Sequence, residues 1–298
     1  MEGPALRSII GPAGVASPTV AHIPHASTVI PAEVRARLLL GDEALARELV
    51  RMTDWHTDTL FAFTGRLGAT RLVNGVSRLV VDPERFTDDA QEPMAAVGQG
   101  AVYTRTSDGL ALRELLDGER DALLDTYFAP YHADLAGLVG DRLAADGRCL
   151  LLDCHSFAAQ PLASELDQTP DRPDVCIGTD AFHTPAALVD ALVDGLAAEG
   201  YVVAVDRPFA GTIVPLSAYR LDRRVASVMI EVRRGLYCDE ATGEPLRQFD
   251  EIGTKLARAT ASALSREGWV PDAIGDTGRD ADAATILSAH PEMDDRLS

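Results

Sequence analysis

The sequence has no apolar run long enough to cross a membrane: no stretch of about 18 uninterrupted apolar residues occurs. The first residues, MEGPALRSIIGPAGVAS, also lack the basic start and the longer apolar core of a secretory signal peptide. We therefore expect a cytoplasmic protein without a membrane partner.

Cysteine and basic residues are also scarce. The cysteines are widely spaced and form no CxxC pair, and they are Cys149, Cys154, Cys176 and Cys238. This spacing favours reduced thiols over a disulfide framework or a structural zinc knot.

The sequence contains only 27 lysine and arginine residues but 46 aspartate and glutamate residues, which gives a formal net charge of −19. Such a surface does not attract a phosphate backbone, so nucleic acid is not an expected partner.

Short β-rich runs alternate with longer helical patterns. The predicted strands cover residues 19–25, 78–82, 100–106, 148–155, 174–179, 201–207 and 226–234, of which 100–106 is the candidate for an edge. The predicted helices cover residues 31–40, 113–145 with a break at Ala129–Pro130, 184–200 and 243–266. Because the strands are almost continuously apolar, the alternation predicts an α/β sheet covered by helices on both faces.

The chain is expected to form one domain. Its 298 residues are 46% hydrophobic, which suffices for a full core, and no internal repeat or linker precedes about residue 268. We expect a short segment at residues 1–16, the domain at residues 17–268, and an acidic tail or late helix at residues 269–298.

Four polar clusters fall at or just after the ends of predicted elements. They are IPHAS with His25, TDWHTDTL with Asp54, LLLDCHSF with His155 and VMIEVRRGLY with Glu231. In open α/β sheets, binding and catalytic residues lie beyond the carboxyl ends of the strands. A charged group inside a central strand is costly unless something compensates it, and a metal ion would compensate all four clusters at once.

Each of these residues also has a purely structural interpretation. His25 could be a satisfied core histidine, and Asp54 could be an ordinary helix N-cap. Asp153 could serve to orient His155. Glu231 has the weakest structural interpretation, because its neighbours are apolar and predict burial. The shared topological position of the four clusters favours a metal site.

The same segments resemble the N-formylglutamate amidohydrolase family, the deformylases of histidine breakdown. The resemblance runs over roughly residues 17–265, through HIPHAST, RLVVDPERF, PYHADL, DCHSF, RPFAGTIV and IEVRRGLYCDE. This family resembles the zinc carboxypeptidases in fold and site. The resemblance therefore implies a three-layer α/β/α fold with a mixed, mostly parallel central sheet, and a catalytic domain over residues 17–268.

The resemblance also implies a catalytic Zn²⁺ or another divalent metal with three protein ligands and one open position. The ligands would be His25, an acid of DWHTD and His155. Asp54 and Asp58 share one helical face, and we expect Asp54 to bind, with Asp58 as the alternative. Glu231 would take a proton from the activated water and pass it to the departing amine. The expected reaction is hydrolysis of a small N-formyl or N-acyl amino acid such as N-formylglutamate.

An N-acyl amino acid carries a carboxylate, whose natural partner is a bidentate arginine. Arg207 is the first choice because it matches an arginine in the family's glycine-containing segment, which here includes Gly211. Arg105 and Arg233 are the next candidates, and Tyr237 is expected to line the same site. Two segments, QGAVYTRT and the RRG that follows Glu231, depart from the family's pattern. Another N-acyl or amide substrate therefore stays open.

Two other functions fit the sequence. A non-catalytic acidic α/β binding protein would have structural histidines and no solvent-reaching cluster of His25, His155 and Glu231. A carboxypeptidase-like peptidase would need an open groove, whereas the inserted segment at residues 161–173 favours closure over a small molecule. The sequence leaves the oligomeric state open, a homo-oligomer included.

Overall fold

The computed structural model describes residues 5–270, and a single mixed sheet runs through them. Its strands are β1 (Arg7–Ile10), β2 (Thr19–Ile23), β3 (Thr70–Asn74), β4 (Cys149–Phe157), β5 (Val175–Gly178), β6 (Val203–Val205) and β7 (Val225–Arg233). They lie in the order β1-β3-β2-β4-β7-β5-β6. The pairs β1/β3 and β5/β7 are antiparallel and the other pairs are parallel.

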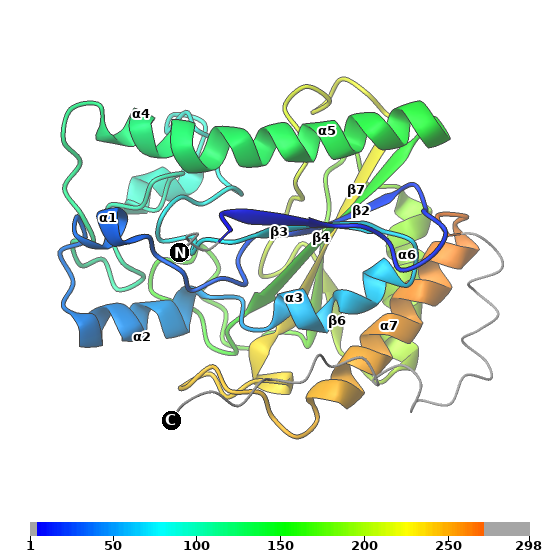
Figure 1. Cartoon of the computed structure of the whole chain (residues 1–298). Helices are drawn as coiled ribbons and strands as arrows, with labels where there is room; N and C mark the ends of the chain where they lie inside the picture. Colours follow the sequence, from blue (N-terminus) through cyan, green and yellow to red (C-terminus); the bar gives the residue numbers. More distant parts are fainter. Residues whose placement is uncertain (1–4, 271–298) are drawn as a thin grey trace, which may run out of the picture.

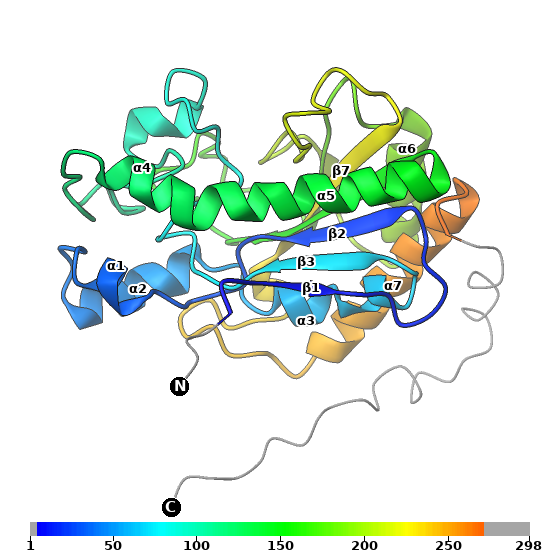
Figure 2. The ribbon, with the colours of Figure 1, turned by 45° about the horizontal axis from the view of Figure 1, so that its top comes forward.

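Helices cover both faces of the sheet (Figure 1). They are α1 (Ala32–Arg35), α2 (Asp42–Met52), α3 (Thr57–Leu60), α4 (Glu119–Leu123), α5 (Ala129–Asp146), α6 (Ala186–Ala198) and α7 (Phe249–Arg266), with short turns η1 (Ala62–Gly65), η2 (Pro93–Val97), η3 (Leu124–Phe128) and η4 (Arg234–Leu236). Helix α5 packs on one face, and α3, α6 and α7 lie on the other. Helices α1, α2 and α4 lie together at one end of the sheet (Figure 2). The predicted three-layer fold with a mostly parallel sheet is confirmed.

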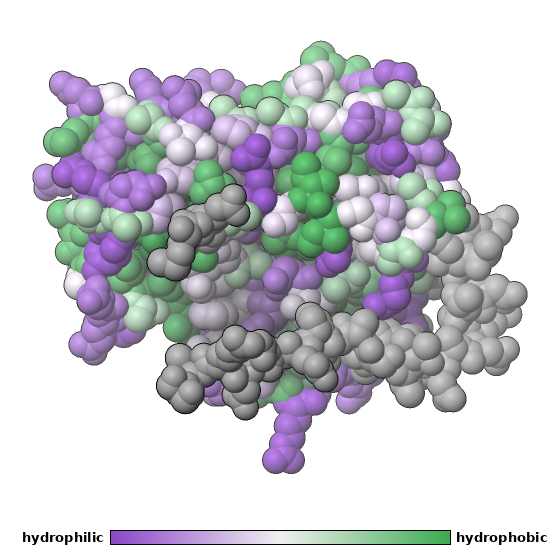
Figure 3. All heavy atoms as spheres, viewed as in Figure 1, coloured by the Kyte–Doolittle hydropathy of each residue, from purple (hydrophilic) through white to green (hydrophobic). Residues whose placement is uncertain are grey.

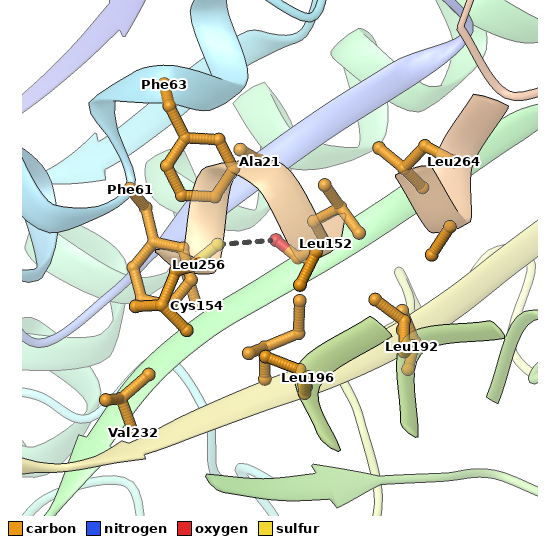
Figure 4. Packing of buried hydrophobic residues seen from close by; sticks show 14 of the residues in the cluster. Ala21, Phe61, Phe63, Leu152, Cys154, Leu192, Leu196, Val232, Leu256 and Leu264 are labelled. Carbon is orange, nitrogen blue, oxygen red and sulfur yellow. Dashed lines mark hydrogen bonds between the residues drawn. The ribbon is translucent and has the colours of Figure 1, made fainter. Parts of the chain in front are cut away.

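The main core lies between the sheet and helices α6 and α7. Strand β4 is buried along its whole length because helix layers cover both of its sides. Figure 4 shows Leu152 and Cys154 of β4 packed among Leu192, Leu196 and Leu256 of these helices. All of the cysteines are buried and free, as their spacing predicts.

Two predicted strands are wrong. Residues 78–82 and 100–106 form turns and irregular backbone, with one isolated bridge at Arg105. The apolar residues of these segments are buried in smaller clusters outside the sheet, so their burial does not require strand pairing. The predicted helix break at Pro130 is also wrong. The π turn η3 leads directly into α5, and its wider turn accommodates Pro130, which has no N–H to donate, inside a continuous helical run.

The sheet has elements that the pattern did not predict. Strand β1 lies within the segment expected to precede the domain, and it pairs with β3 at the sheet edge. At the other end of the described chain, Trp269 and Val270 are buried in the main core. The rest of the predicted acidic tail, residues 271–298, lies outside the described residues.

Within residues 5–270, no helix combines the length and the apolar character that a membrane-spanning helix needs. On the face shown in Figure 3, hydrophilic side chains surround smaller hydrophobic patches.

Candidate metal centre and its pocket

Three side chains from distant parts of the chain converge beyond the ends of the central strands. His25 follows β2, Asp54 lies in the turn between α2 and α3, and His155 lies near the end of β4. Their candidate ligand atoms all lie within 4.8 Å of one another. Asp54 Oδ2 is 3.2 Å from His155 Nδ1 and 3.6 Å from His25 Nδ1. The structure thus brings together the three residues that the sequence names as metal ligands.

Asp54 reaches the cluster from a turn and not from a helix start. Helix α2 ends at Met52, and the backbone N–H of Asp54 donates to the carbonyl of His25 at 3.0 Å. The side chain accepts a hydrogen bond from the backbone N–H of Ser156 at 3.2 Å. Asp58, the alternative ligand, is exposed on α3 and accepts from the backbone N–H of Thr59. The structure does not bring Asp58 to the cluster.

Each histidine of the cluster is held by a buried carboxylate on its far nitrogen. His25 Nε2 lies 2.8 Å from Asp82 Oδ1, and His155 Nε2 lies 2.8 Å from Asp153 Oδ1. The Nδ1 atom of His25 is buried and has no hydrogen-bond partner among the described residues. Metal-binding histidines in proteins show this arrangement, in which one ring nitrogen donates to a carboxylate and the other faces the ion.

His22, the first histidine of HIPH, has a different place from His25. Its Nδ1 atom lies 2.9 Å from Asp153 Oδ1 and 3.1 Å from Glu84 Oε1. Complete burial lowers the pKa of His22, but the two carboxylates outweigh burial and raise it to about 9. His22 is therefore a buried cation that holds Asp153 in place behind His155.

The charge of the site also fits a divalent cation. When His25 and His155 are neutral, as metal binding requires, the carboxylates outnumber the buried cations Arg78, Arg85 and His22. These carboxylates are Asp54, Asp82, Glu84 and Asp153. Burial alone would raise the pKa of Asp54. Hydrogen bonds with His155 and His25 outweigh it and hold that pKa well below its usual range. A buried excess of negative charge is costly unless a cation offsets it.

Glu231 lies beside the cluster on the neighbouring strand, with His155 as its register partner. It is 7% exposed, and its Oε2 atom has no hydrogen-bond partner among the described residues. Burial raises the pKa of Glu231 to about 8, although the positive charge of His155 acts in the opposite direction. A carboxylate with a raised pKa in a cavity can both accept and return a proton near neutral pH.

The raised pKa predicts a pH-dependent stability of the metal-free protein. The contribution of protonated Glu231 to the free energy of unfolding is fully present below the unfolded-state pKa of about 4.5. This contribution is lost as pH rises through the folded-state pKa of about 8. Without metal, the wild type should therefore lose on the order of a few kcal/mol more unfolding free energy than Glu231→Gln between pH 5 and pH 8. Urea unfolding in chelator at both pH values measures this, and equal losses in the two proteins would contradict it.

A cavity of about 550 Å³ opens onto the cluster. His25, Asp54, His155 and Glu231 contribute to its lining, together with Arg85. The Nε atom of Arg85 is buried without a hydrogen-bond partner among residues 5–270, and it lies 3.6 Å from Asp82 Oδ2. This guanidinium is thus oriented by a buried carboxylate and faces the cavity.

Most of the predicted substrate residues lie elsewhere. Arg207, Arg105, Arg233 and Tyr237 do not line the cavity, whereas Gly211 does. Arg207 and Arg105 are exposed, and Arg207 follows β6 at the sheet edge, away from the central strands. Arg233 pairs with Asp174, because the register of β7 with β5 places it there.

The Tyr237 hydroxyl is buried and donates to the carbonyl of Trp55 at 2.9 Å. This hydrogen bond turns the side chain away from the cavity.

A charged loop that was not predicted as part of the site includes Arg78, Asp82, Glu84 and Arg85. Arg78 donates to Asp82 Oδ2 at 2.8 Å, and the Tyr103 hydroxyl donates to the same oxygen at 2.5 Å. The signal was the charged run DPER directly after the apolar LVV. The predicted strand at residues 78–82 concealed it, because a strand would have turned alternate residues to opposite faces.

Comparison with known proteins agrees with this geometry. The family model for N-formylglutamate amidohydrolase matches residues 17–238. The N-formylglutamate deformylase of Pseudomonas aeruginosa is 30% identical over 232 residues, which cover 75% of this chain and 83% of that protein. The N-formylglutamate deformylase of Pseudomonas putida is 27% identical over 248 residues, which cover 79% and 86%.

Solved structures are similar over most of the chain. The crystal structure of N-formylglutamate amidohydrolase from Ralstonia eutropha has a TM-score of 0.77 and 27% identity, covering 89% of this chain and 99% of that one. A gene product of Agrobacterium tumefaciens shares the fold, with a TM-score of 0.67 and 19% identity over 89% and 97% of the two chains. The predicted resemblance is confirmed, and the chain belongs to the N-formylglutamate amidohydrolase family.

Proposed function

We propose that this protein is a metal-dependent amidohydrolase that cleaves the amide bond of a small N-formyl or N-acyl amino acid. One observation carries the proposal: the free Nδ1 atom of His25 faces Asp54 and His155, and Glu231 lies one strand away in the same cavity. The related Pseudomonas proteins are N-formylglutamate deformylases, which supports the reaction class.

The residues fit a zinc-like divalent ion. His25 Nδ1, an oxygen of Asp54 and His155 Nδ1 would hold it, and a nitrogen and oxygen donor set of this size is typical of catalytic zinc. When bound, the ion supplies Lewis acidity, which lowers the pKa of a water molecule and polarises the amide carbonyl. Asp82 and Asp153 keep the two imidazole rings in the orientation that binding requires.

Glu231 performs the proton transfers. Its carboxylate takes a proton from the attacking water as the oxygen bonds to the carbonyl carbon. It then gives that proton to the amide nitrogen as the C–N bond breaks, so the amine leaves neutral. The raised pKa of Glu231 suits a group that has to hold the proton between these two steps.

Arg85 replaces Arg207 as the proposed partner of the substrate carboxylate. Arg78 lies beside it but is already held by Asp82 and Tyr103, whereas Arg85 makes only a longer contact with Asp82. A guanidinium of this kind can bind a carboxylate through two parallel N–H donors.

The segment at residues 161–173 supports a small substrate over a peptide. It contributes Leu162, Glu165 and Leu166 to the cavity wall, and Glu165 is held there by an ion pair with Arg172. A wall at this place limits the length of chain that the site can accept.

Metal analysis tests the proposal. The purified protein should contain about one zinc-like ion per chain, because the cluster offers one set of three ligands. Chelation should abolish amide hydrolysis and lower the melting temperature while circular dichroism keeps most of its native signal, since bound metal stabilises only the folded state. Full activity in chelator, together with no metal by elemental analysis, would overturn it.

A further inference from the structure

The turn that carries Asp54 has backbone carbonyl groups that the backbone itself does not satisfy. Helix α2 ends just before this turn, and the last carbonyls of a helix have no partner within it. The carbonyls of Arg51, Thr53 and Trp55 accept no backbone hydrogen bond among the residues that the structure describes. Carbonyl groups at a largely buried position need a partner from elsewhere in the chain.

Arg234 is the partner of two of these carbonyls. Its Nη1 atom donates to the carbonyl of Arg51 at 2.8 Å and to the carbonyl of Thr53 at 2.7 Å. The Arg234 side chain is buried. An arginine at the carboxyl end of a helix satisfies the free carbonyls there and also interacts favourably with the helix dipole. Arg234 thus fixes the point at which α2 ends and the turn begins.

Tyr237 holds the other side of the same turn. Its buried hydroxyl donates to the carbonyl of Trp55. Thr53 and Trp55 are the two chain neighbours of Asp54. The hydrogen bonds from Arg234 and Tyr237 therefore fix the backbone on both sides of the residue that supplies the carboxylate to the cluster.

The chain segment that holds this turn also carries the general base. Arg234 and Tyr237 follow Glu231 by three and six residues. Strand β7 ends at Arg233, and the short turn η4 then closes through a hydrogen bond of 3.0 Å from the Tyr237 N–H to the Arg234 carbonyl. One short stretch of ordered backbone thus connects the strand of Glu231 to the turn of Asp54.

We propose that Arg234 and Tyr237 are positioning residues that raise the metal affinity of the site by holding Asp54 in its ligand position. This inference rests on the metal centre of the proposed function, and it requires no contact of either residue with substrate. A mobile turn has to be ordered when the ion binds, and ordering a backbone costs free energy. A turn that is already ordered on folding binds the ion more tightly.

Competition between the purified protein and a chromogenic chelator for Zn²⁺ tests the inference. Arg234→Met keeps an unbranched side chain but removes both hydrogen bonds, and it should weaken Zn²⁺ binding about 10- to 100-fold, as the loss of a group that supports a ligand does. Arg234→Lys should recover part of this loss, because a single nitrogen makes both bonds in the wild type.

Tyr237→Phe is the second variant. It keeps the buried ring and removes one hydrogen bond, so it tests the inference even where Arg234→Met does not fold. Zn²⁺ binding should weaken about 3- to 10-fold. Arg234 lines the cavity but Tyr237 does not, so an effect in Tyr237→Phe is independent of any contact with substrate.

Two matched controls remove similar groups elsewhere. Arg172 is also buried and donates to the carbonyls of Ala158 and Asp167. The buried Tyr201 hydroxyl lies 3.5 Å from the carbonyl of Ile252. Neither side chain lines the cavity. Arg172→Met and Tyr201→Phe should therefore keep the wild-type affinity for Zn²⁺, whatever they cost in thermal stability.

A double-mutant cycle separates positioning from a general loss of stability. In Asp54→Ala the ligand itself is absent, so the addition of Arg234→Met should change the remaining Zn²⁺ affinity by less than about two-fold. Calorimetry measures this weaker binding. An equal loss in both backgrounds would overturn the inference, because Arg234 would then act without Asp54. Unchanged affinity in Arg234→Met and Tyr237→Phe would overturn it as well.

Amide hydrolysis by the wild type distinguishes this inference from the proposed function. Zn²⁺ affinity that depends on Arg234 through Asp54, without hydrolysis by the wild type, supports the positioning role and overturns the proposed function. Hydrolysis by the wild type together with full Zn²⁺ affinity in both variants overturns the positioning role alone. A wild type that neither binds Zn²⁺ nor hydrolyses the amide overturns both.

Discussion

Glu231→Gln should keep the fold and the bound metal but lower turnover about 10²- to 10⁴-fold, which is the usual contribution of general acid–base catalysis. Glutamine has the same shape and can still form hydrogen bonds, yet its amide cannot accept a proton from the attacking water. Stability should not fall, because a neutral amide replaces a carboxyl that is buried without a hydrogen-bond partner on Oε2. Steady-state kinetics, elemental analysis and thermal unfolding measure the three quantities.

Glu48→Gln is the matched control for this experiment. Glu48 is also a buried glutamate whose pKa burial raises, but it bonds to Ser107 and does not line the cavity. It should therefore keep its turnover. A Glu231→Gln variant with a near-normal rate would make Glu231 a structural strand residue. Loss of metal together with activity would make Glu231 a ligand, and the acid of the DWHTD segment would then be the candidate base.

His25→Ala and His155→Ala should each lower metal affinity by at least about 10- to 100-fold, the loss that follows from disturbing a ligand's supporting carboxylate alone. Turnover should fall in parallel, because a three-ligand site cannot spare a donor. Competition with a chromogenic chelator measures the affinity. Stoichiometric, tight metal binding in both variants would show that these histidines are structural.

Two controls lie on the neighbouring turn. His56 bonds to the carbonyl of Gly243 and has a φ of 60°, which asparagine tolerates, so His56→Asn should keep its metal affinity. Asp58→Asn should do the same, because Asp58 is exposed on α3 and is not part of the cluster. A loss of metal in Asp58→Asn would restore the alternative ligand that the sequence left open.

The site residues at the ends of the central strands could be predicted from the sequence. The strands that contain His155 and Glu231 are apolar over most of their length, so both strands were predicted and the charged or ionisable residues near their ends could be recognised. Strand pairing then brings the two side chains together, because parallel neighbours end at the same edge of the sheet. The order of such motifs along the chain was also sufficient to predict the family and the layer arrangement.

The positions of the loop residues depended on the tertiary structure. Asp54 and Asp58 are four residues apart and equivalent in a helical pattern, but a turn between α2 and α3 directs one inward and leaves the other exposed. Arg85 reaches the cavity in place of Arg207 because Leu79 and Val80 are buried outside the sheet and fold the preceding segment into a turn. The sequence by itself determined the residues that lie on strands, since alternation and apolar runs are local signals. It did not determine the ligand from the DWHTD turn or the arginine of the pocket, because the path of a loop is decided by contacts with residues far away in the chain.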